Sequence, residues 1–240
     1  MSTWSPFRPS QSDLDRIADD VAAIPAIQDT LLAHHPDLTT RDRVAHQYQI
    51  AGGRVDLTIA GSLPEDLTGV GLFEPGSSHI GIGRVSTGLG CPHLETDPDF
   101  LGLSIAFQTG RGERVDFLTI NHPAAPTDTH QDFVKLLEAT AEGVGAEPPF
   151  GSGLGELDLL DLLASNTKLT RSLISSLGIK RGGGTALHVL GQTVRTAKSS
   201  TAYQPYWTGA VEVGGQIGKF VFVPTKDDNP LRDLKPGERH

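Results

Sequence analysis

The chain has 240 residues, enough for one sizeable domain or two small ones, and carries a formal net charge of −9. This acidic balance, without a run of Lys or Arg, argues against binding to nucleic acid. Because Cys91 is the only cysteine, an internal disulfide and a multi-cysteine zinc or iron–sulfur site are excluded. No stretch reaches the roughly 20 apolar residues of a membrane helix, and residues 1–10 do not resemble a signal peptide, so a cytoplasmic location is expected by default.

The first predicted element is a helix over residues 12–33, where apolar residues recur at near-helical spacing. Ser12 or Asp13 is the expected N-terminal cap. Pro25 is expected to break or kink the helix in its middle. We predict that residues 1–42 form an N-terminal helical arm that lies on another surface.

Alternating apolar and polar residues then predict several short strands. The first lies within residues 43–59, where Val55, Leu57 and Ile59 alternate with polar residues. Three more are expected over residues 80–85, 103–107 and 115–120, with a hairpin turn at residues 109–112. This spacing is typical of an antiparallel sheet or barrel.

The second half of the chain is predicted to be helical before it returns to strands. Helices are expected over residues 129–142, 156–177 and 185–195, and strands over 207–213 and 219–223, joined at Gly214 and Gly215. Helices and strands that follow one another in blocks indicate an α+β protein.

One segment suggests chemistry. Arg43, Val44, Ala45 and His46 precede the first strand, and a histidine at that position could point into a barrel and act as an acid or a base. On these residues alone, the simpler interpretation is favoured, in which Arg43 and His46 decorate a loop. The chain has no phosphate-binding loop, no paired-histidine metal motif and no Gly-x-Ser-x-Gly nucleophile elbow.

Several short motifs nevertheless occur in an order that resembles the catalase superfamily, above all its shorter bacterial members. The matching segments are residues 43–46 (Arg-Val-Ala-His), 82–87, 97–102, 116–123 (Asp-Phe-Leu-Thr-Ile-Asn-His-Pro), 206–209 and 219–224. The resemblance implies a catalase-like antiparallel β-barrel over residues 43–224, with a helical insertion at about 128–200 and a polar tail over 225–240. It also implies a haem cofactor and a homo-oligomer.

The resemblance assigns roles to individual residues. His46 would be the distal histidine that exchanges a proton with bound peroxide, and Ser86 would orient its ring. Asn121, the second residue of the family's asparagine pair, is a further candidate catalytic residue. Arg43 and Arg84 would bind the haem propionates.

The sequence also departs from the family pattern. Ile120 stands in place of the distal asparagine, Leu101 in place of an arginine, and Ala124 and Ala125 in place of two phenylalanines. None of the three tyrosines matches the proximal iron ligand, whose region would follow His240. A partner chain could supply that part.

Three hypotheses follow. The first is a haem-dependent catalase or peroxidase that acts on hydrogen peroxide or an organic hydroperoxide. The second is a degenerate, haem-free member that serves as a small-molecule binding module or an interaction subunit. The third is an enzyme for lipid hydroperoxides, which the small Ala124 and Ala125 side chains would admit.

Overall fold

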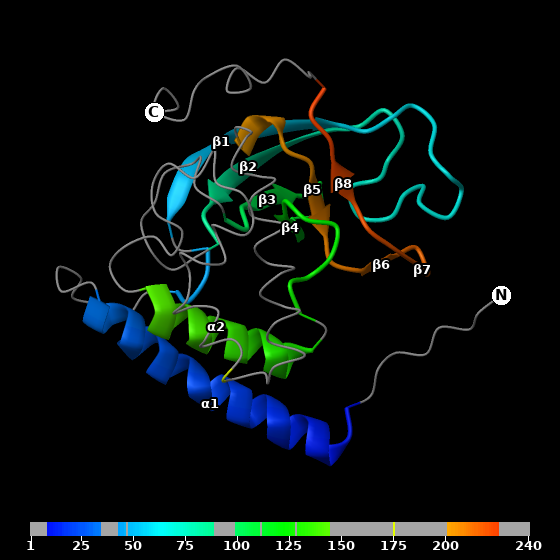
Figure 1. Ribbon diagram of the computed structural model, residues 1–240. Coiled ribbons are helices and arrows are strands. Elements are labelled where there is room, and N and C mark those ends of the chain that lie inside the picture. The colour runs from blue at the N-terminus through cyan, green and yellow to red at the C-terminus, as the bar shows by residue number, and fades with distance from the viewer. Residues whose placement is uncertain are drawn as a thin grey trace, which may run out of the picture.

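The computed structural model describes residues 9–34, 43–46, 48–88, 99–110, 112–127, 129–144, 175 and 201–225. These residues form an α+β fold in which two α-helices accompany a curled antiparallel sheet (Figure 1). The predicted α+β class is therefore confirmed. The predicted helices over 156–177 and 185–195 fall outside the described residues, apart from Ser175, as does the tail beyond residue 225.

Helix α1 spans Gln11–His34 and is continuous through Pro25, so the expected break is wrong. A proline within a helix removes one backbone hydrogen bond, and packing of the following turns can offset that loss. Ile27 and Leu31, which follow Pro25, are buried against α2. This burial supports the turns on the C-terminal side of Pro25.

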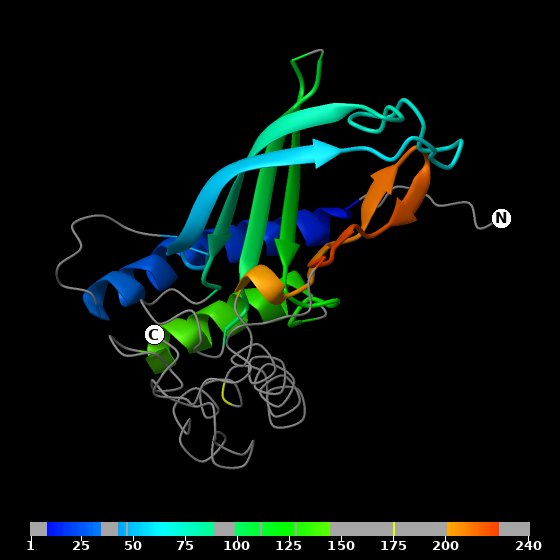
Figure 2. The ribbon, with the colours of Figure 1, turned by 90° about the horizontal axis from the view of Figure 1, so that it is seen from above.

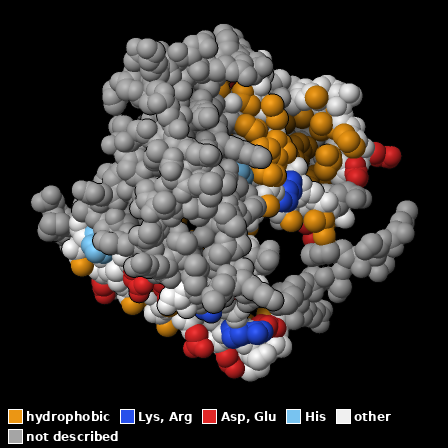
Figure 3. Space-filling view, viewed as in Figure 1, with side chains coloured by type: hydrophobic (Ala, Val, Ile, Leu, Met, Phe, Trp, Pro, Cys, Tyr) orange, Lys and Arg blue, Asp and Glu red, His pale blue; other side chains and the backbone are white. Residues whose placement is uncertain are grey.

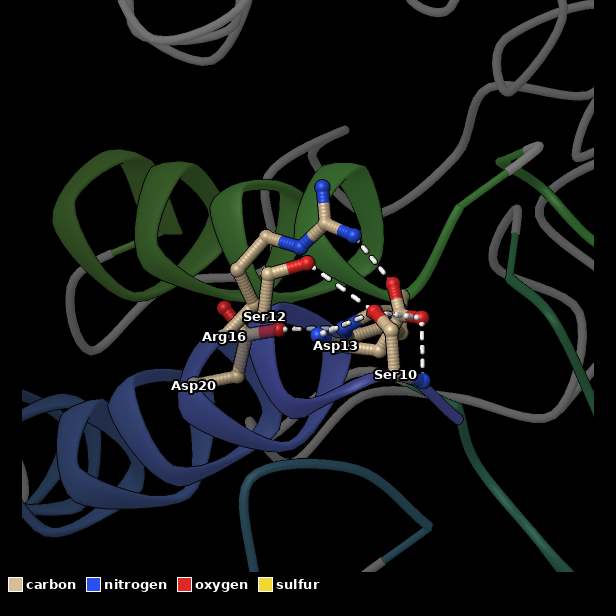
Figure 4. A network of polar contacts seen from close by, with 6 residues as sticks. Ser10, Ser12, Asp13, Arg16 and Asp20 are labelled. Carbon is tan, nitrogen blue, oxygen red and sulfur yellow. Dashed lines mark hydrogen bonds and ion pairs between the residues drawn. The ribbon is translucent and has the colours of Figure 1, made fainter. Parts of the chain in front are cut away.

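The N-terminal cap of α1 is Ser10, not Ser12 or Asp13 as expected. The Ser10 hydroxyl accepts a hydrogen bond from the Asp13 N–H at 3.2 Å, and the Asp13 carboxylate accepts one from the Ser10 N–H at 2.9 Å (Figure 4). This reciprocal arrangement is a capping box. Hydrogen bonds from Ser10, together with the neighbouring Arg16, lower the pKa of Asp13 to about 2.

Helix α2 spans His130–Val144 and agrees with the predicted helix over 129–142. Figure 1 shows α1 and α2 side by side beneath the sheet. Asp20 of α1 forms an ion pair with His130 at 2.9 Å when the imidazole is protonated. Helix α2 begins beside Asp20, so the turns of α1 that precede Asp20 extend beyond the start of α2. Leu14 and Ile17 in those turns are exposed.

The sheet has six strands in the order β1-β2-β3-β4-β5-β8, and every neighbouring pair is antiparallel. The first four strands are β1 (Gln49–Thr58), β2 (Ser78–Ser86), β3 (Gly102–Gln108) and β4 (Arg114–Ile120). They agree with the four strands predicted from alternation. The predicted hairpin at 109–112 is also confirmed, because the Thr109 N–H donates to the Glu113 carbonyl across the turn at 2.8 Å.

The C-terminal strands differ from the prediction. Two strands were expected, but there are four: β5 (Tyr206–Thr208), β6 (Val211–Val213), β7 (Gln216–Gly218) and β8 (Val221–Phe222). The Gly214–Gly215 turn, with positive φ at both glycines, joins β6 to β7 in a separate two-stranded sheet. This hairpin lies by the connection between β1 and β2 (Figure 2), where a Cβ built on Gly214 would be 1.9 Å from the Asp66 carbonyl.

The two faces of the sheet have different roles. We call one the core face: it carries the buried Ile105, Phe107 and Phe117, packed with Leu72 and with the aromatic rings of Phe220 and Phe222. Alternate residues on the same strands point to the other face, which we call the site face. From β2 to β4 its rows are Ser86–Gly102–Ile120, Arg84–Ser104–Leu118 and Ile82–Ala106–Asp116.

Candidate functional site

The segment that carries His46 lies where the helices meet the sheet. Val44 packs on the α1–α2 cluster of Ile27, Leu31 and Ala141. Two residues later, His46 has a φ of 55° and is the only described non-glycine residue with positive φ. Such a conformation costs about 1 kcal/mol or more for a residue with a Cβ, so the surrounding contacts must hold it.

Those contacts engage both backbone groups of His46. Its N–H donates to the Gly88 carbonyl at 3.2 Å, and its carbonyl accepts from the Arg84 guanidinium at 2.7 Å. Arg84 lies near the end of β2 and Gly88 just beyond it, so β2 positions the backbone of His46. Arg84 thus touches His46 directly, although the prediction assigned it to a cofactor.

Ser86, also near the end of β2, holds the imidazole itself. Its hydroxyl lies 3.3 Å from Nδ1 of His46, and the Ser86 side chain is buried. The ring lies against Gly102 at the start of β3, because a Cβ built there would be 2.6 Å from Nδ1 and 2.7 Å from Cε1. Only glycine leaves room for the imidazole at this position.

A buried carboxylate completes the surroundings of His46, and sequence reasoning missed it. Asp99 is fully buried and accepts hydrogen bonds from the Gly88 N–H at 2.5 Å and the Phe100 N–H at 2.6 Å. It therefore fixes Gly88, whose carbonyl in turn holds His46. In the sequence, Asp99 stands in the segment Asp97-Pro98-Asp99, where nothing distinguishes it from the neighbouring carboxylate.

Burial lowers the pKa of His46 below its ordinary value. The negative charge of Asp99 opposes this shift, as does a hydrogen bond with the Thr87 backbone. The positive charges of Arg43 and Arg84 reinforce it. The imidazole of His46 is therefore neutral at neutral pH and able to accept a proton.

Beside His46, the site face presents an apolar strip. Its centre is formed by the small β3 residues Gly102, Ser104 and Ala106. Ile82 of β2 and Leu118 of β4 flank them and are 73% and 69% exposed, and the other ends of their rows carry the charged Asp116 and Arg84. Exposed large apolar side chains that cluster on one face are a feature of binding surfaces. A separate patch of hydrophobic side chains lies in the region of β5 and β8 on the face turned to the viewer (Figure 3).

The side chain of Asn121 links two other segments of the chain through hydrogen bonds. Its side-chain oxygen accepts from the Leu101 N–H at 2.9 Å, and its amide donates to the Gln204 side chain at 2.7 Å. Both bonds are buried. The structure thus brings His46, Ser86 and Arg84 into direct contact, whereas the contacts of Asn121 join it to Leu101 and Gln204.

The side chains around His46 can be compared with those that a bound haem would need. Ser86 and Arg84 contact His46 beside the apolar strip, and this is the part of the set that a flat ligand with carboxylates would need on one side. Arg43 is exposed beside them. Among the described residues there is no group of three or more His, Cys, Asp or Glu side chains arranged to hold a metal ion. Of the tyrosines, Tyr206 is buried and donates its hydroxyl to the Thr201 carbonyl at 3.1 Å, so it does not supply an axial ligand.

Comparison with known proteins adds no assignment. No protein-family model matches the chain, and no curated protein matches it in sequence. Among the described helices, none combines the length and the apolar character needed to cross a membrane. The function must therefore be argued from the geometry around His46.

Proposed function

We propose that this protein is a haem-dependent oxidoreductase of the catalase or peroxidase type, in which His46 exchanges a proton with a bound hydroperoxide. The observation that carries the proposal is the contact between the Ser86 hydroxyl and Nδ1 of His46, with the ring packed on Gly102. The resemblance to the catalase superfamily predicts a hydroxyl beside the histidine ring, and the contact between these two residues, 40 positions apart in sequence, supports the proposal.

The chain's own residues would perform the proton transfer. Because burial keeps the imidazole neutral, His46 can take the peroxide proton and then return it to the departing oxygen. The Ser86 hydroxyl contacts the ring at Nδ1, and the Thr87 backbone makes a further hydrogen bond with the ring. The fixed backbone of His46 holds the ring in one orientation during both steps.

Binding of the cofactor would fall to the site face. Ile82, Ala106 and Leu118 would contact the macrocycle, which when bound supplies the redox chemistry. A guanidinium has five N–H donors, and Arg84 gives one nitrogen to His46, so it retains donors for a carboxylate. Arg43 would bind the second carboxylate. No described residue is proposed to bind the iron itself.

The test is a titration with hemin followed by hydroperoxide turnover. We expect a Soret band that saturates at one equivalent, and a loss of turnover of roughly 100- to 10,000-fold in His46→Gln with haem binding retained. His79→Gln is the matched control, because His79 lies at the opposite end of β2 and bonds to Ser77 and to the Leu72 carbonyl. Equal turnover in both variants, or no Soret band, would refute the proposal.

A haem-free binding function is the second candidate. The use of Asn121 as a link between Leu101 and Gln204, and the apolar Ile120 on the site face, favour it. The ligand would then be an apolar carboxylic acid, with Arg84 binding its carboxylate. Calorimetry with a long-chain fatty acid should show binding that Arg84→Gln weakens about tenfold, in protein that gives no Soret band with hemin.

A further inference from the structure

Strand β1 forms an open edge of the sheet. It is ten residues long and pairs with β2 on one side. Among the described strands, none pairs with its other side. Most of its residues are exposed, and it runs along the border of the curled sheet (Figure 2). Such an edge presents free N–H and C=O groups to another strand.

The charges on β1 are complementary to those of a second β1. Arg54 and Asp56 flank Val55 and lie on the site face, where they form an ion pair at 2.7 Å with both side chains 65% exposed. If two β1 strands pair antiparallel about a two-fold axis at Val55, each Arg54 stands directly opposite the Asp56 of the other copy. Opposite charges at facing positions stabilise an antiparallel pair.

The core face is compatible with the same register. Two-fold pairing at Val55 places Gly53 of one copy opposite Leu57 of the other. A Cβ built on Gly53 would meet nothing within 4 Å, so open space lies beside it. Leu57 already packs on the core cluster of its own sheet. Leu57 of the second copy would lie in the open space beside Gly53 of the first copy, so the two chains would not clash there.

We propose that two copies of this chain associate through β1, antiparallel about a two-fold axis at Val55, so that their sheets become one continuous sheet. The interface is isologous, because the same strand contributes from both copies. Backbone hydrogen bonds would supply the affinity, and the facing Arg54–Asp56 pairs would set the register.

The first experiment reverses the charges and measures mass by sedimentation. The full-length protein should be a dimer, and Arg54→Asp or Asp56→Arg should each weaken it about tenfold or more, because like charges then face each other. A mixture of the two variants should form a heterodimer, since every facing pair is again opposite in charge. Each variant has lost its own Arg54–Asp56 pair, so an effect within one chain cannot explain this recovery.

A cross-link tests the register itself. In a Cys91→Ser background, Val55→Cys should form a disulfide-linked dimer on mild oxidation, because the two positions face each other across the axis. Thr58→Cys is the control: it would face Gly52 of the other copy and should cross-link far less. A monomeric protein, a dimer unaffected by both charge reversals, or equal cross-linking of the two cysteine variants would overturn the proposal.

Discussion

The backbone of His46 is the most constrained feature at the scale of single residues. Its φ of 55° is unfavourable for a side chain with a Cβ, yet both backbone groups and the ring are engaged by Gly88, Arg84 and Ser86. Strain that neighbours hold in place is common where a side chain must have one orientation. The arrangement therefore places a neutral imidazole in a defined position beside the apolar strip.

The lowered pKa of His46 makes a prediction about stability and pH. In the unfolded chain the pKa is about 6.5, and in the folded protein it is lower because of burial. Above pH of about 7 both states carry neutral imidazole. As the pH falls through about 6.5, the unfolded state takes up a proton that the folded state resists, so the free energy of unfolding should fall until the folded pKa is passed.

Urea unfolding at several pH values would check this. His46→Gln should remove part of the pH dependence, while His79→Gln, in the same strand-rich region, should leave that part in place. Proton NMR of the His46 ring should give a pKa below that of an unfolded peptide. A titration at or above about 6.5 would show that burial does not dominate.

Gly102 gives a second prediction at this scale. In Gly102→Ala the new methyl group would be 2.6 Å from Nδ1 of His46 and 3.2 Å from the Ser86 hydroxyl. We expect the ring to be displaced, the stability to fall by about 1–3 kcal/mol and the pKa of His46 to rise towards its ordinary value. Gly61→Ala is the control, because a Cβ there meets nothing within 4 Å. If both variants behave alike in unfolding and NMR, the ring does not pack on Gly102.

At the scale of secondary-structure elements, Asn121 links segments far apart in the chain. Following β4, it binds the Leu101 N–H before β3 and the Gln204 side chain before β5. Asn121→Ala should lower the free energy of unfolding by about 1–3 kcal/mol, because the buried Leu101 N–H loses its acceptor. A double-mutant cycle with Gln204→Ala should give a coupling of about 0.5–3 kcal/mol.

Gln108→Ala, at the exposed end of β3, is the control for that cycle and should show no coupling with Asn121→Ala. If Asn121→Ala had the same free energy of unfolding as the unmodified protein, the role of Asn121 as a structural link would be contradicted. If such a variant lost only hydroperoxide turnover, the catalytic role expected from the resemblance would be favoured instead.

Elements with a clear period could be predicted from sequence, and short ones could not. Alternation over at least five residues located β2, β3 and β4, and helical spacing located α1 and α2. The C-terminal strands have two or three residues each, too few to show a period. The capping role of Ser10 depends on its relation to Asp13 and was missed because Ser12 also precedes the apolar pattern.

The site could be predicted only in part. The resemblance paired His46 with Ser86, and the structure places them in contact. Local spacing could not have shown this, because the pair depends on how β1 and β2 align. Asp99 and Gly102 were missed for the same reason: their roles arise from the meeting of the His46 segment, the end of β2 and the start of β3.

At the scale of the whole molecule, the core face joins the central strands β3 and β4 to β8 at one edge of the described sheet. The Phe117 ring on β4 meets Phe107 at 6.1 Å, Phe220 at 5.3 Å and Phe222 at 5.5 Å, in each case edge to face. Phe220 and Phe222 come from about 100 residues later in the chain. The sheet is therefore completed only when the C-terminal strands dock on this ring.

Phe117→Ala should consequently destabilise the whole sheet and not one hairpin. We expect a loss of about 3–5 kcal/mol, because the change removes a buried ring and its aromatic contacts together. Phe133→Ala on α2 is the matched control: Phe133 is 39% exposed and should cost far less. Hydrogen exchange should show faster opening of β3, β4, β5 and β8 in Phe117→Ala alone. If exchange increased only in β3 and β4, the C-terminal strands would be held by other contacts, and Phe117 would not be the residue that joins them to β3 and β4.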